Sequence, residues 1–477
     1  MAIYLNTNIP LENYKELCRK KYMVDKSLII EKLNDLIGIS DKYICITRPR
    51  RFGKTSIIDM LGAYYTKTVD SKDLFDKLNI STTDDYLKHL NKYNVISISF
   101  NKISDKGNTF FEYMNMIKTS LINDIVEKYP HINPNKYFTI SDMLNDTNEK
   151  FIFIMDEWDY IFNNNLFIDH QNEFLEFLRN LLKDKSYVAL AYMTGVLPIK
   201  KHSSTSALNM FDEYTMLNDM LYGEFFGFTE KEVKKICELQ NKISFEEISA
   251  WYNGYTNEEG DKIYNPRSVV KALQNGKCIS YWTNTGAMDE VLQYLKYNTL
   301  DVRDDVIEMV SGEVIDIFID EEYRAGQGTP KTKKEIYSAM IILGFLSYHD
   351  GYLKIPNKEL MREFEKSLRD ESFGYVSEII NNSRNVLRAT LNDSDTLVKL
   401  LHDIHNSEIP ILQYNDENSL SCVVTLAYLS ARDTYRVERE EKTGKGYADF
   451  TFHPRRKNDT AFIVELKKDE SPEVAIN

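Results

Sequence analysis

The chain has 477 residues, which corresponds to about three domains of ordinary size and excludes a single small domain. Hydrophobic residues make up 43% of the sequence and charged residues 28%, which excludes a wholly disordered chain. The net charge of −14 argues against a surface that is basic throughout, so we expect any nucleic-acid contact to be confined to a local groove.

The five cysteines are scattered and never form a Cys-x-x-Cys pair, so the sequence predicts neither a disulfide framework nor a zinc site. We therefore expect a reducing compartment, the cytoplasm, with the nucleus as the alternative. The N-terminal segment lacks a basic start followed by an apolar run, and no uninterrupted apolar stretch approaches about 18 residues. We expect no membrane partner.

Apolar, β-branched runs in the first half of the chain predict four buried strands, at 42–47, 95–100, 150–155 and 187–194. Stretches with helical spacing lie between them, at 55–65, 110–128 and 171–183. Strands that alternate with helices predict a mainly parallel α/β sheet with right-handed crossovers.

The pattern changes to helices after about Gly227, which predicts a small helical appendage to the sheet. Residues 280–400 are also mostly helical and contain no chemistry that spacing alone reveals. From about Ser419 we expect a helix and then strands around 447–452 and 461–467.

The first predicted strand is followed by Arg48-Pro-Arg-Arg-Phe-Gly-Lys-Thr55 and then directly by a predicted helix. The ending Gly53-Lys54-Thr55 is that of a P-loop, in which backbone N–H groups and a helix N-terminus cradle phosphate oxygens. We expect Lys54 to contact the β and γ phosphates and the Thr55 hydroxyl to ligate Mg²⁺. The strict motif has glycine where this chain has Arg48.

Basic residues are concentrated in this loop although the chain as a whole is acidic. The four are Arg48, Arg50, Arg51 and Lys54. Such a local excess of positive charge suits a polyphosphate, and a solvated basic loop is the alternative.

About a hundred residues later, the strand predicted at 150–155 ends in Asp156-Glu157. An aspartate at the carboxyl end of a strand can hold Mg²⁺ through water, and an adjacent glutamate can polarise the attacking water. The alternative is that these acids cap the next helix. Thr194, at the end of the fourth strand, is a candidate contact for the γ-phosphate or the attacking water.

Near the C-terminus, Asp449 lies on one predicted strand and Glu465-Leu-Lys467 on the next. Glu465 and Lys467 project from the same face, and a hairpin would bring Asp449 close to both. The two acids could then bind a divalent metal, while Lys467 orients a water for attack on a phosphodiester. An exposed polar hairpin is the alternative. Further acids that would complete a metal site are Glu417, Glu438, Glu440 and Glu441.

Together these motifs resemble AAA-ATPase-like proteins with a C-terminal nuclease domain of the PD-(D/E)XK superfamily. The passages that carry the resemblance are 48–55, 155–159, 194–196, 226–230, 251–255, 264–266, 281–286, 427–433, 444–449 and 465–467.

The resemblance implies an AAA+-like P-loop core at 1–228, a helical lid at 229–280, a helical linker region at 281–395 and a small α+β nuclease-like domain at 396–477. It implies ATP and Mg²⁺ as cofactors, DNA as a candidate partner and a homo-oligomer as a candidate assembly. The nucleotide ligands implied are Arg48, Arg51, Gly53, Lys54, Thr55, Ser56, Asp156 and Thr194, with Thr55 and Asp156 at the metal and Glu157 catalytic. In the nuclease-like domain Asp449, Glu465 and Lys467 are the catalytic candidates, with the first two as metal ligands.

The chain departs from the family pattern at two places. Leu197-Pro198 stands where relatives often have an arginine, and the chain ends ten residues after Lys467, so we expect an incomplete nuclease fold. The first functional hypothesis is an ATPase coupled to a nuclease-like module that acts on DNA. The second is a nucleotide-dependent switch or scaffold with an inactive pseudo-nuclease domain.

Overall fold

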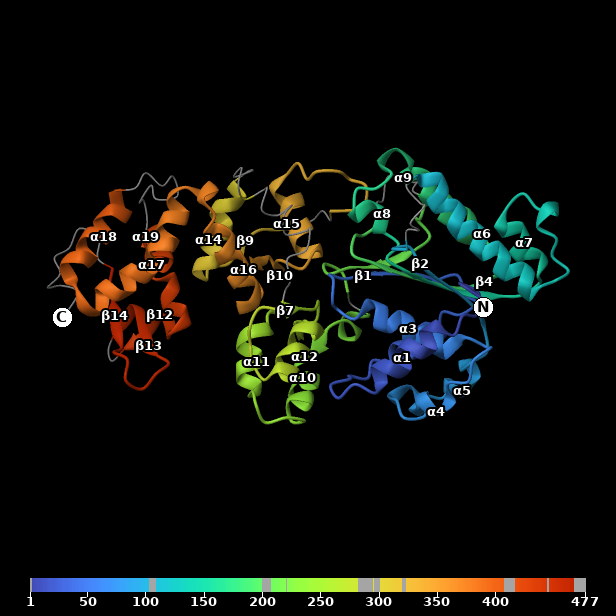
Figure 1. Ribbon diagram of the computed structural model, residues 1–477, viewed down its shortest axis with the longest axis horizontal. Coiled ribbons are helices and arrows are strands. Elements are labelled where there is room, and N and C mark those ends of the chain that lie inside the picture. The colour runs from blue at the N-terminus through green and yellow to red at the C-terminus, as the bar shows by residue number, and fades with distance from the viewer. Residues whose placement is uncertain are drawn as a thin grey trace. The chain divides into compact units, whose positions relative to one another are not determined.

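The computed structural model divides into two compact units (Figure 1). The first comprises 1–283 and 317–359, and the second comprises 284–316 and 360–477. The residues that the structure describes are 2–102, 109–199, 207–219, 221–281, 295, 301–319, 323–406, 417–443 and 446–466.

A five-stranded sheet lies at the centre of the first unit, with the strand order β2-β3-β4-β1-β5 and parallel pairing throughout. Its strands are β1 (Tyr43–Thr47), β2 (Asn94–Ser99), β3 (Phe151–Asp156), β4 (Val188–Gly195) and β5 (Asp212–Tyr214). The four strands predicted from apolar runs are confirmed, and β5 is an addition. Because the strands are parallel, the carboxyl ends of β1, β3 and β4 lie at the same edge of the sheet.

Helices cover both faces of this sheet (Figure 1). On β3, Phe153 and Met155 pack into one core and Ile152 and Ile154 into the other, as expected for a strand buried on both faces. The helices of the first core are α6 (Phe110–Lys128), α7 (Ile140–Asp146), α8 (Tyr160–Asn163) and α9 (Gln171–Leu182). Those of the second are α1 (Ile9–Cys18), α2 (Ile29–Asn34), α3 (Lys54–Tyr65), α4 (Lys72–Phe75) and α5 (Tyr86–His89). This is the α/β fold class that the sequence predicts.

A smaller helical subdomain with its own apolar core follows the sheet. Its elements are β6 (Phe228–Thr229), α10 (Glu230–Cys237), α11 (Phe245–Tyr252), β7 (Tyr255–Thr256), β8 (Lys262–Tyr264) and α12 (Pro266–Asn275). Thr229 and Glu232 form a capping box at the start of α10, which explains why the helix begins there. The salt bridge of 2.7 Å between Lys26 and Glu232 ties this subdomain to the N-terminal segment.

The rest of the first unit is a later segment with α15 (Lys333–Ile342), β10 (Ser347–His349) and β11 (Tyr352–Lys354). It packs on the sheet through Arg324, whose guanidinium donates to the carbonyl oxygen of Ile199 at 2.7 Å and to Glu213 at 2.8 Å. It packs on the helical subdomain where the hydroxyl of Tyr255 donates to the carbonyl oxygen of Gly344 at 2.6 Å.

The second unit combines helices with a small antiparallel sheet. Its helices are α14 (Val302–Ser311), α16 (Lys358–Leu368, which starts at the unit boundary), α17 (Tyr375–Asn392), α18 (Ser394–Asn406) and α19 (Glu417–Ala427). Its strands are β9 (Ile315–Asp316), β12 (Tyr435–Thr443), β13 (Gly446–Pro454) and β14 (Phe462–Val464). The expected strands around 447–452 and 461–467 correspond to β13 and β14, and β12 is an addition. Among the described residues, no helix is long and apolar enough to cross a bilayer.

The N-terminal segment pairs with β2, which is an edge strand of the large sheet. The carboxylate of Asp124, on α6, accepts hydrogen bonds from the backbone N–H groups of Ile3, Tyr4 and Leu5 at 2.6 to 3.0 Å. Asp124 is buried, so its charge depends on these donors for stabilisation.

We predict that Asp124→Ala releases this segment. Three backbone donors lose their acceptor, and a buried unsatisfied donor costs about 1–3 kcal/mol, so we expect a loss of about 2–4 kcal/mol in unfolding free energy. Denaturant unfolding measures the loss, and hydrogen exchange at Tyr4 and Leu5 localises it. Asp124→Asn keeps one acceptor oxygen and should lose less. Equal stability of the alanine variant and the wild type would contradict the anchoring role.

Candidate functional site

The loop between β1 and α3 has the backbone geometry of a phosphate cradle. Gly53 has a φ of +93°, a left-handed conformation that favours glycine, and α3 begins at the next residue, Lys54. No side chain of the described residues caps the N-terminus of α3 by a hydrogen bond. Its first N–H groups are therefore available to donate hydrogen bonds to an anionic ligand.

The side chain of Lys54 is buried beneath this loop. Its ammonium donates to the carbonyl oxygens of Arg48 at 2.8 Å and Pro49 at 2.9 Å. Burial lowers the pKa of Lys54 to about 8, and the nearby carboxylates of Asp159 and Asp156 oppose that shift. A phosphate oxygen could replace the two carbonyl oxygens as the acceptor. The ammonium is charged below about pH 8, and a charged ammonium bonds more strongly to an anionic oxygen than to a neutral carbonyl oxygen.

The predicted contact between the loop and β3 is present. The hydroxyl of Thr55 donates to Oδ2 of Asp156 at 3.0 Å, and the backbone N–H of Glu157 donates to Oδ1 at 3.0 Å. Burial raises the pKa of Asp156 to about 6. The two oxygens expected at a metal ion therefore lie together at the carboxyl edge of the sheet, beside a buried carboxylate that a cation would stabilise.

Asp156 and Glu157 do not cap the next helix. The residue before α8 is Asp159, and β3 ends at Asp156. Glu157 has a φ of +50° between them and lines a cavity with Lys54. The capping alternative therefore does not account for these two acids.

Asp159 is a site residue that the motif analysis missed. It is 2% exposed, and its carboxylate accepts hydrogen bonds from the N–H groups of Val196 at 3.0 Å and Leu197 at 2.8 Å. A Cβ on Gly195 would lie 2.4 Å from its Oδ1, so glycine allows this close approach. Asp159 thus joins the segment after β3 to the end of β4. It closes the passage 155–159 that carries the family resemblance, although no role was assigned to it from sequence.

Two of the expected nucleotide ligands are buried elsewhere. The guanidinium of Arg48 forms an ion pair with Asp219 at 3.3 Å and stacks on the ring of Phe226, and Arg48 is 1% exposed. The hydroxyl of Thr194 donates to the carbonyl oxygen of Ile46 on β1 at 2.7 Å. Neither Arg48 nor Thr194 is among the described residues that line the cavity.

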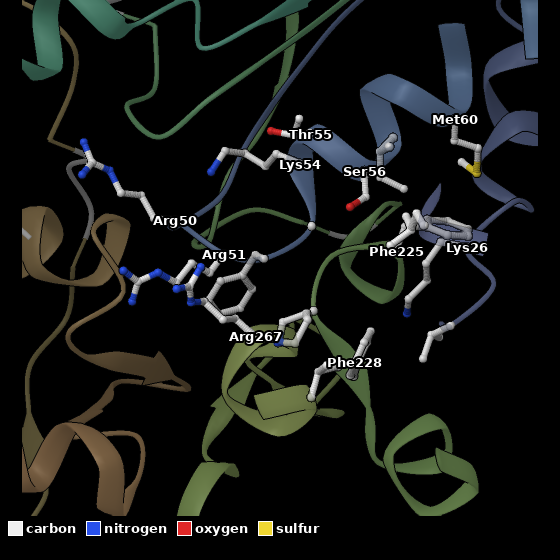
Figure 2. Close-up of a pocket in the computed structure, with 18 of the residues that line it drawn as sticks. Lys26, Arg50, Arg51, Lys54, Thr55, Ser56, Met60, Phe225, Phe228 and Arg267 are labelled. Carbon is white, nitrogen blue, oxygen red and sulfur yellow. The ribbon is translucent and has the colours of Figure 1, made fainter. Parts of the chain in front are cut away.

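The cavity beside the loop measures about 770 Å³, a size in the ordinary range for a small-molecule site. Figure 2 shows Lys54 and Thr55 at the start of α3, with Arg51 and Arg267 to one side and Met60 and Phe225 to the other. One end thus carries arginines, and the other is mainly apolar with Lys26 beside Phe225. The apolar lining residues include Tyr14, Leu17, Ile57, Met60, Phe225, Phe228 and Val270.

Arg267 is a second site residue that was missed. Asn265 caps α12, and its side chain accepts a hydrogen bond from the N–H of Ser268 at 3.2 Å. Proline follows at the first helical position, so the chain presents Arg267 in the first turn, where it lines the cavity. Burial and the charge of Arg267 lower the pKa of Arg51, which indicates that the two guanidinium groups are close.

In the second unit, β13 and β14 form the predicted antiparallel pair, with Phe450 opposite Val464. Oδ2 of Asp449 accepts a hydrogen bond from the backbone N–H of Leu466 at 2.6 Å, which places Asp449 beside the residue after Glu465. Both acids are partly exposed. Lys467 lies outside the described residues.

Comparison with family models agrees with this architecture. Residues 8–205 match the model described as a predicted AAA-ATPase, named AAA-ATPase-like. Residues 415–476 match the model of a PD-(D/E)XK nuclease superfamily. The chain therefore contains a domain of each kind, and the predicted resemblance is confirmed.

A curated relative is distantly similar to this chain. An uncharacterized protein in the 5′ region of vnfD of Azotobacter chroococcum is 28% identical over 277 residues, which are 56% of this chain and 51% of that protein. The chain thus spans about half the length of this curated relative.

Two solved structures also match. A Walker-type ATPase of Pyrococcus abyssi is 14% identical, with a TM-score of 0.37, over 71% of this chain and 93% of that one. The ORC2 protein of Aeropyrum pernix is 12% identical, with a TM-score of 0.30, over 75% of this chain and 94% of that one.

We predict that nucleotide binding in the presence of Mg²⁺ is strongest between about pH 6 and pH 8. Below its pKa of about 6, Asp156 is protonated and loses the charge that favours a cation. Above its pKa of about 8, Lys54 loses the charge that favours phosphate. Equilibrium binding of a fluorescent ATP analogue across this range measures both limbs.

Asp156→Asn is the control for the fall in affinity below about pH 6. It should remove the pH dependence that comes from the protein and leave the pH dependence that comes from protonation of ATP itself. An affinity that rises between pH 8 and pH 9 would contradict the assignment of the basic limb to Lys54.

Proposed function

We propose that the first unit binds ATP with Mg²⁺ and hydrolyses the γ-phosphate. The observation that carries this proposal is the hydrogen bond between Thr55 and Asp156, beside the buried ammonium of Lys54, since Thr55 and Lys54 both line the cavity. It brings a hydroxyl, a carboxylate and a cation to the N-terminus of one helix, although they come from segments a hundred residues apart. P-loop ATPases use this combination.

The residues present fit a nucleotide with Mg²⁺. Thr55 and Asp156 would hold the ion, and Lys54, Arg51 and the N–H groups of α3 would hold the phosphates. Mg²⁺, when bound, neutralises charge on the phosphate oxygens. The apolar end of the cavity would receive the base and exclude water from it.

Glu157 would act as the general base. It lines the cavity next to Asp156, and the left-handed backbone at Glu157 separates its side chain from β3. It accepts a proton from the attacking water, whose oxygen bonds to the γ-phosphorus as the bond to the β-phosphate oxygen breaks. Arg267, from the helical subdomain, would counter negative charge on the phosphates. ATP would thereby link that subdomain to the sheet.

We further propose that the nuclease-like domain acts on DNA with a divalent metal. Asp449 and Glu465 would ligate the ion, and Lys467 would orient the attacking water. The support is the pairing of β13 with β14 and the hydrogen bond from Leu466 to Asp449. The metal would offset the repulsion between these acids and the phosphodiester. This matters because the chain as a whole is acidic and repels DNA.

We predict that Lys54→Ala and Glu157→Gln impair ATP hydrolysis for different reasons. Lys54→Ala removes a phosphate ligand and should weaken ATP binding. Glu157→Gln should keep ATP bound and slow hydrolysis by about 10²–10⁴-fold, the usual contribution of a general base. Phosphate release and ATP binding are measured on the same preparations.

The matched control is Lys72→Ala, which removes an exposed lysine of α4 that is 53% accessible and pairs with Asp76 directly after that helix. If the wild type hydrolyses ATP no faster than Lys54→Ala does, the proposal of ATP hydrolysis is wrong. If the wild type binds ATP tightly but hydrolyses it no faster than Glu157→Gln does, the result would instead support a nucleotide-dependent switch.

For the nuclease-like domain, we predict nicking of supercoiled DNA with Mg²⁺ or Mn²⁺ that is lost in Asp449→Ala and in Lys467→Ala. Asp459→Ala is the matched control, because Asp459 lies in the loop between β13 and β14. Gel electrophoresis with and without chelator measures the nicks. Equal cleavage by wild type and both variants would show that another nuclease is responsible.

A further inference from the structure

Three metal-ligating side chains meet on the pair of strands β12 and β13. They are Glu438 and Glu441 of β12 and His453 of β13. One oxygen of each carboxylate and one imidazole nitrogen all lie within 4.8 Å of one another. The three side chains are 27% to 37% exposed, so an ion can reach them from solvent.

The contacts within the trio are specific. Nε2 of His453 lies 2.7 Å from Oε2 of Glu441 and 3.7 Å from Oε2 of Glu438. Nε of Arg436 lies 3.1 Å from Oε1 of Glu438 and occupies that oxygen. The other oxygen of Glu438 is therefore the one that faces the imidazole. Partners of this kind commonly orient the ligands of a metal.

A buried threonine lies next to the trio. Thr451 is directly opposite Glu438 in the strand register and two residues before His453, on the same face of β13. It is 6% exposed, and its side chain lies close to the carboxylate of Glu441. One side of the trio is therefore closed by the protein.

The histidine of the trio lies away from the candidate nuclease centre. Asp449 and His453 are four residues apart on β13, which corresponds to about 13 Å at the rise of a strand. Glu441 pairs with Ala448, the residue before Asp449, so the trio extends along β13 from the neighbourhood of Asp449 to His453. Glu438 and Glu441, which were candidates from sequence to complete the site of Asp449, each have an oxygen within 4.8 Å of the imidazole nitrogen of His453.

We propose that Glu438, Glu441 and His453 bind a divalent transition-metal ion of the Zn²⁺ class that clips β12 to β13. One imidazole nitrogen with two carboxylate oxygens suits such ions, whereas Mg²⁺ prefers oxygen ligands alone. A metal at Nε2 would replace the hydrogen bond between His453 and Glu441.

The test is calorimetric titration of ZnCl₂ into the full chain after chelator treatment. The chain carries Asp449→Asn and Glu465→Gln, so that the nuclease-like centre contributes nothing. In that background, His453→Gln, Glu441→Gln and Glu438→Gln should each weaken Zn²⁺ binding by more than about tenfold. Glu440→Gln is the matched control, because it removes an exposed carboxylate of β12 that lies between the two ligands.

Circular dichroism without metal checks that each variant folds, and Glu438→Gln leaves the contact between His453 and Glu441 intact. A rise in melting temperature on adding Zn²⁺ should occur in this background and be lost in the three ligand variants. Millimolar Mg²⁺ should not compete. Zn²⁺ affinity within about twofold of the background in His453→Gln, or equal competition by Mg²⁺, would overturn the site and leave an ordinary ion pair between His453 and Glu441.

Discussion

The first unit is organised around a buried charge, the ammonium of Lys54. Burial disfavours this charge, and two carbonyl oxygens and the carboxylates of Asp156, Glu157 and Asp159 offset the cost. Each of these groups must therefore be held accurately. Gly53 turns the loop toward the ammonium, Thr55 orients Asp156, and Asp159 is fixed by the N–H groups that follow β4. The ammonium and the three strands β1, β3 and β4 thus depend on one another.

Much of this arrangement follows from local sequence. The strands β1 to β4 are recognisable because burial on both faces requires uninterrupted apolar runs, and a P-loop turn has a fixed order of residues. β5 is short and polar, and β12 carries six charged residues among nine, so neither resembles a buried strand. Their positions are set by pairing with β1 and β13, which no local pattern reveals.

The site was predictable to the same extent. Lys54, Thr55 and Asp156 act through motifs with fixed spacing, and the structure brings them together. Arg48 looked like a phosphate ligand because its loop is basic, yet its partner Asp219 lies 171 residues away and draws it into the interior. Arg267 lies outside the motifs, and Asp159 closes one of them without a role that its spacing reveals. Their roles arise from a helix cap and from a close approach to Gly195, which are tertiary facts.

The attachment of the N-terminal segment also constrains how the first unit reaches its native state. Tyr4 and Leu5 precede Asp124, the acceptor that holds them, by about 120 residues in the chain. Contacts of such long sequence separation form slowly, since the chain between them must first be ordered. Until α6 holds the N-terminal segment, this edge of β2 lacks its cover and can pair with another chain. The hydrogen bonds to Asp124 therefore also limit the pairing of β2 with other chains.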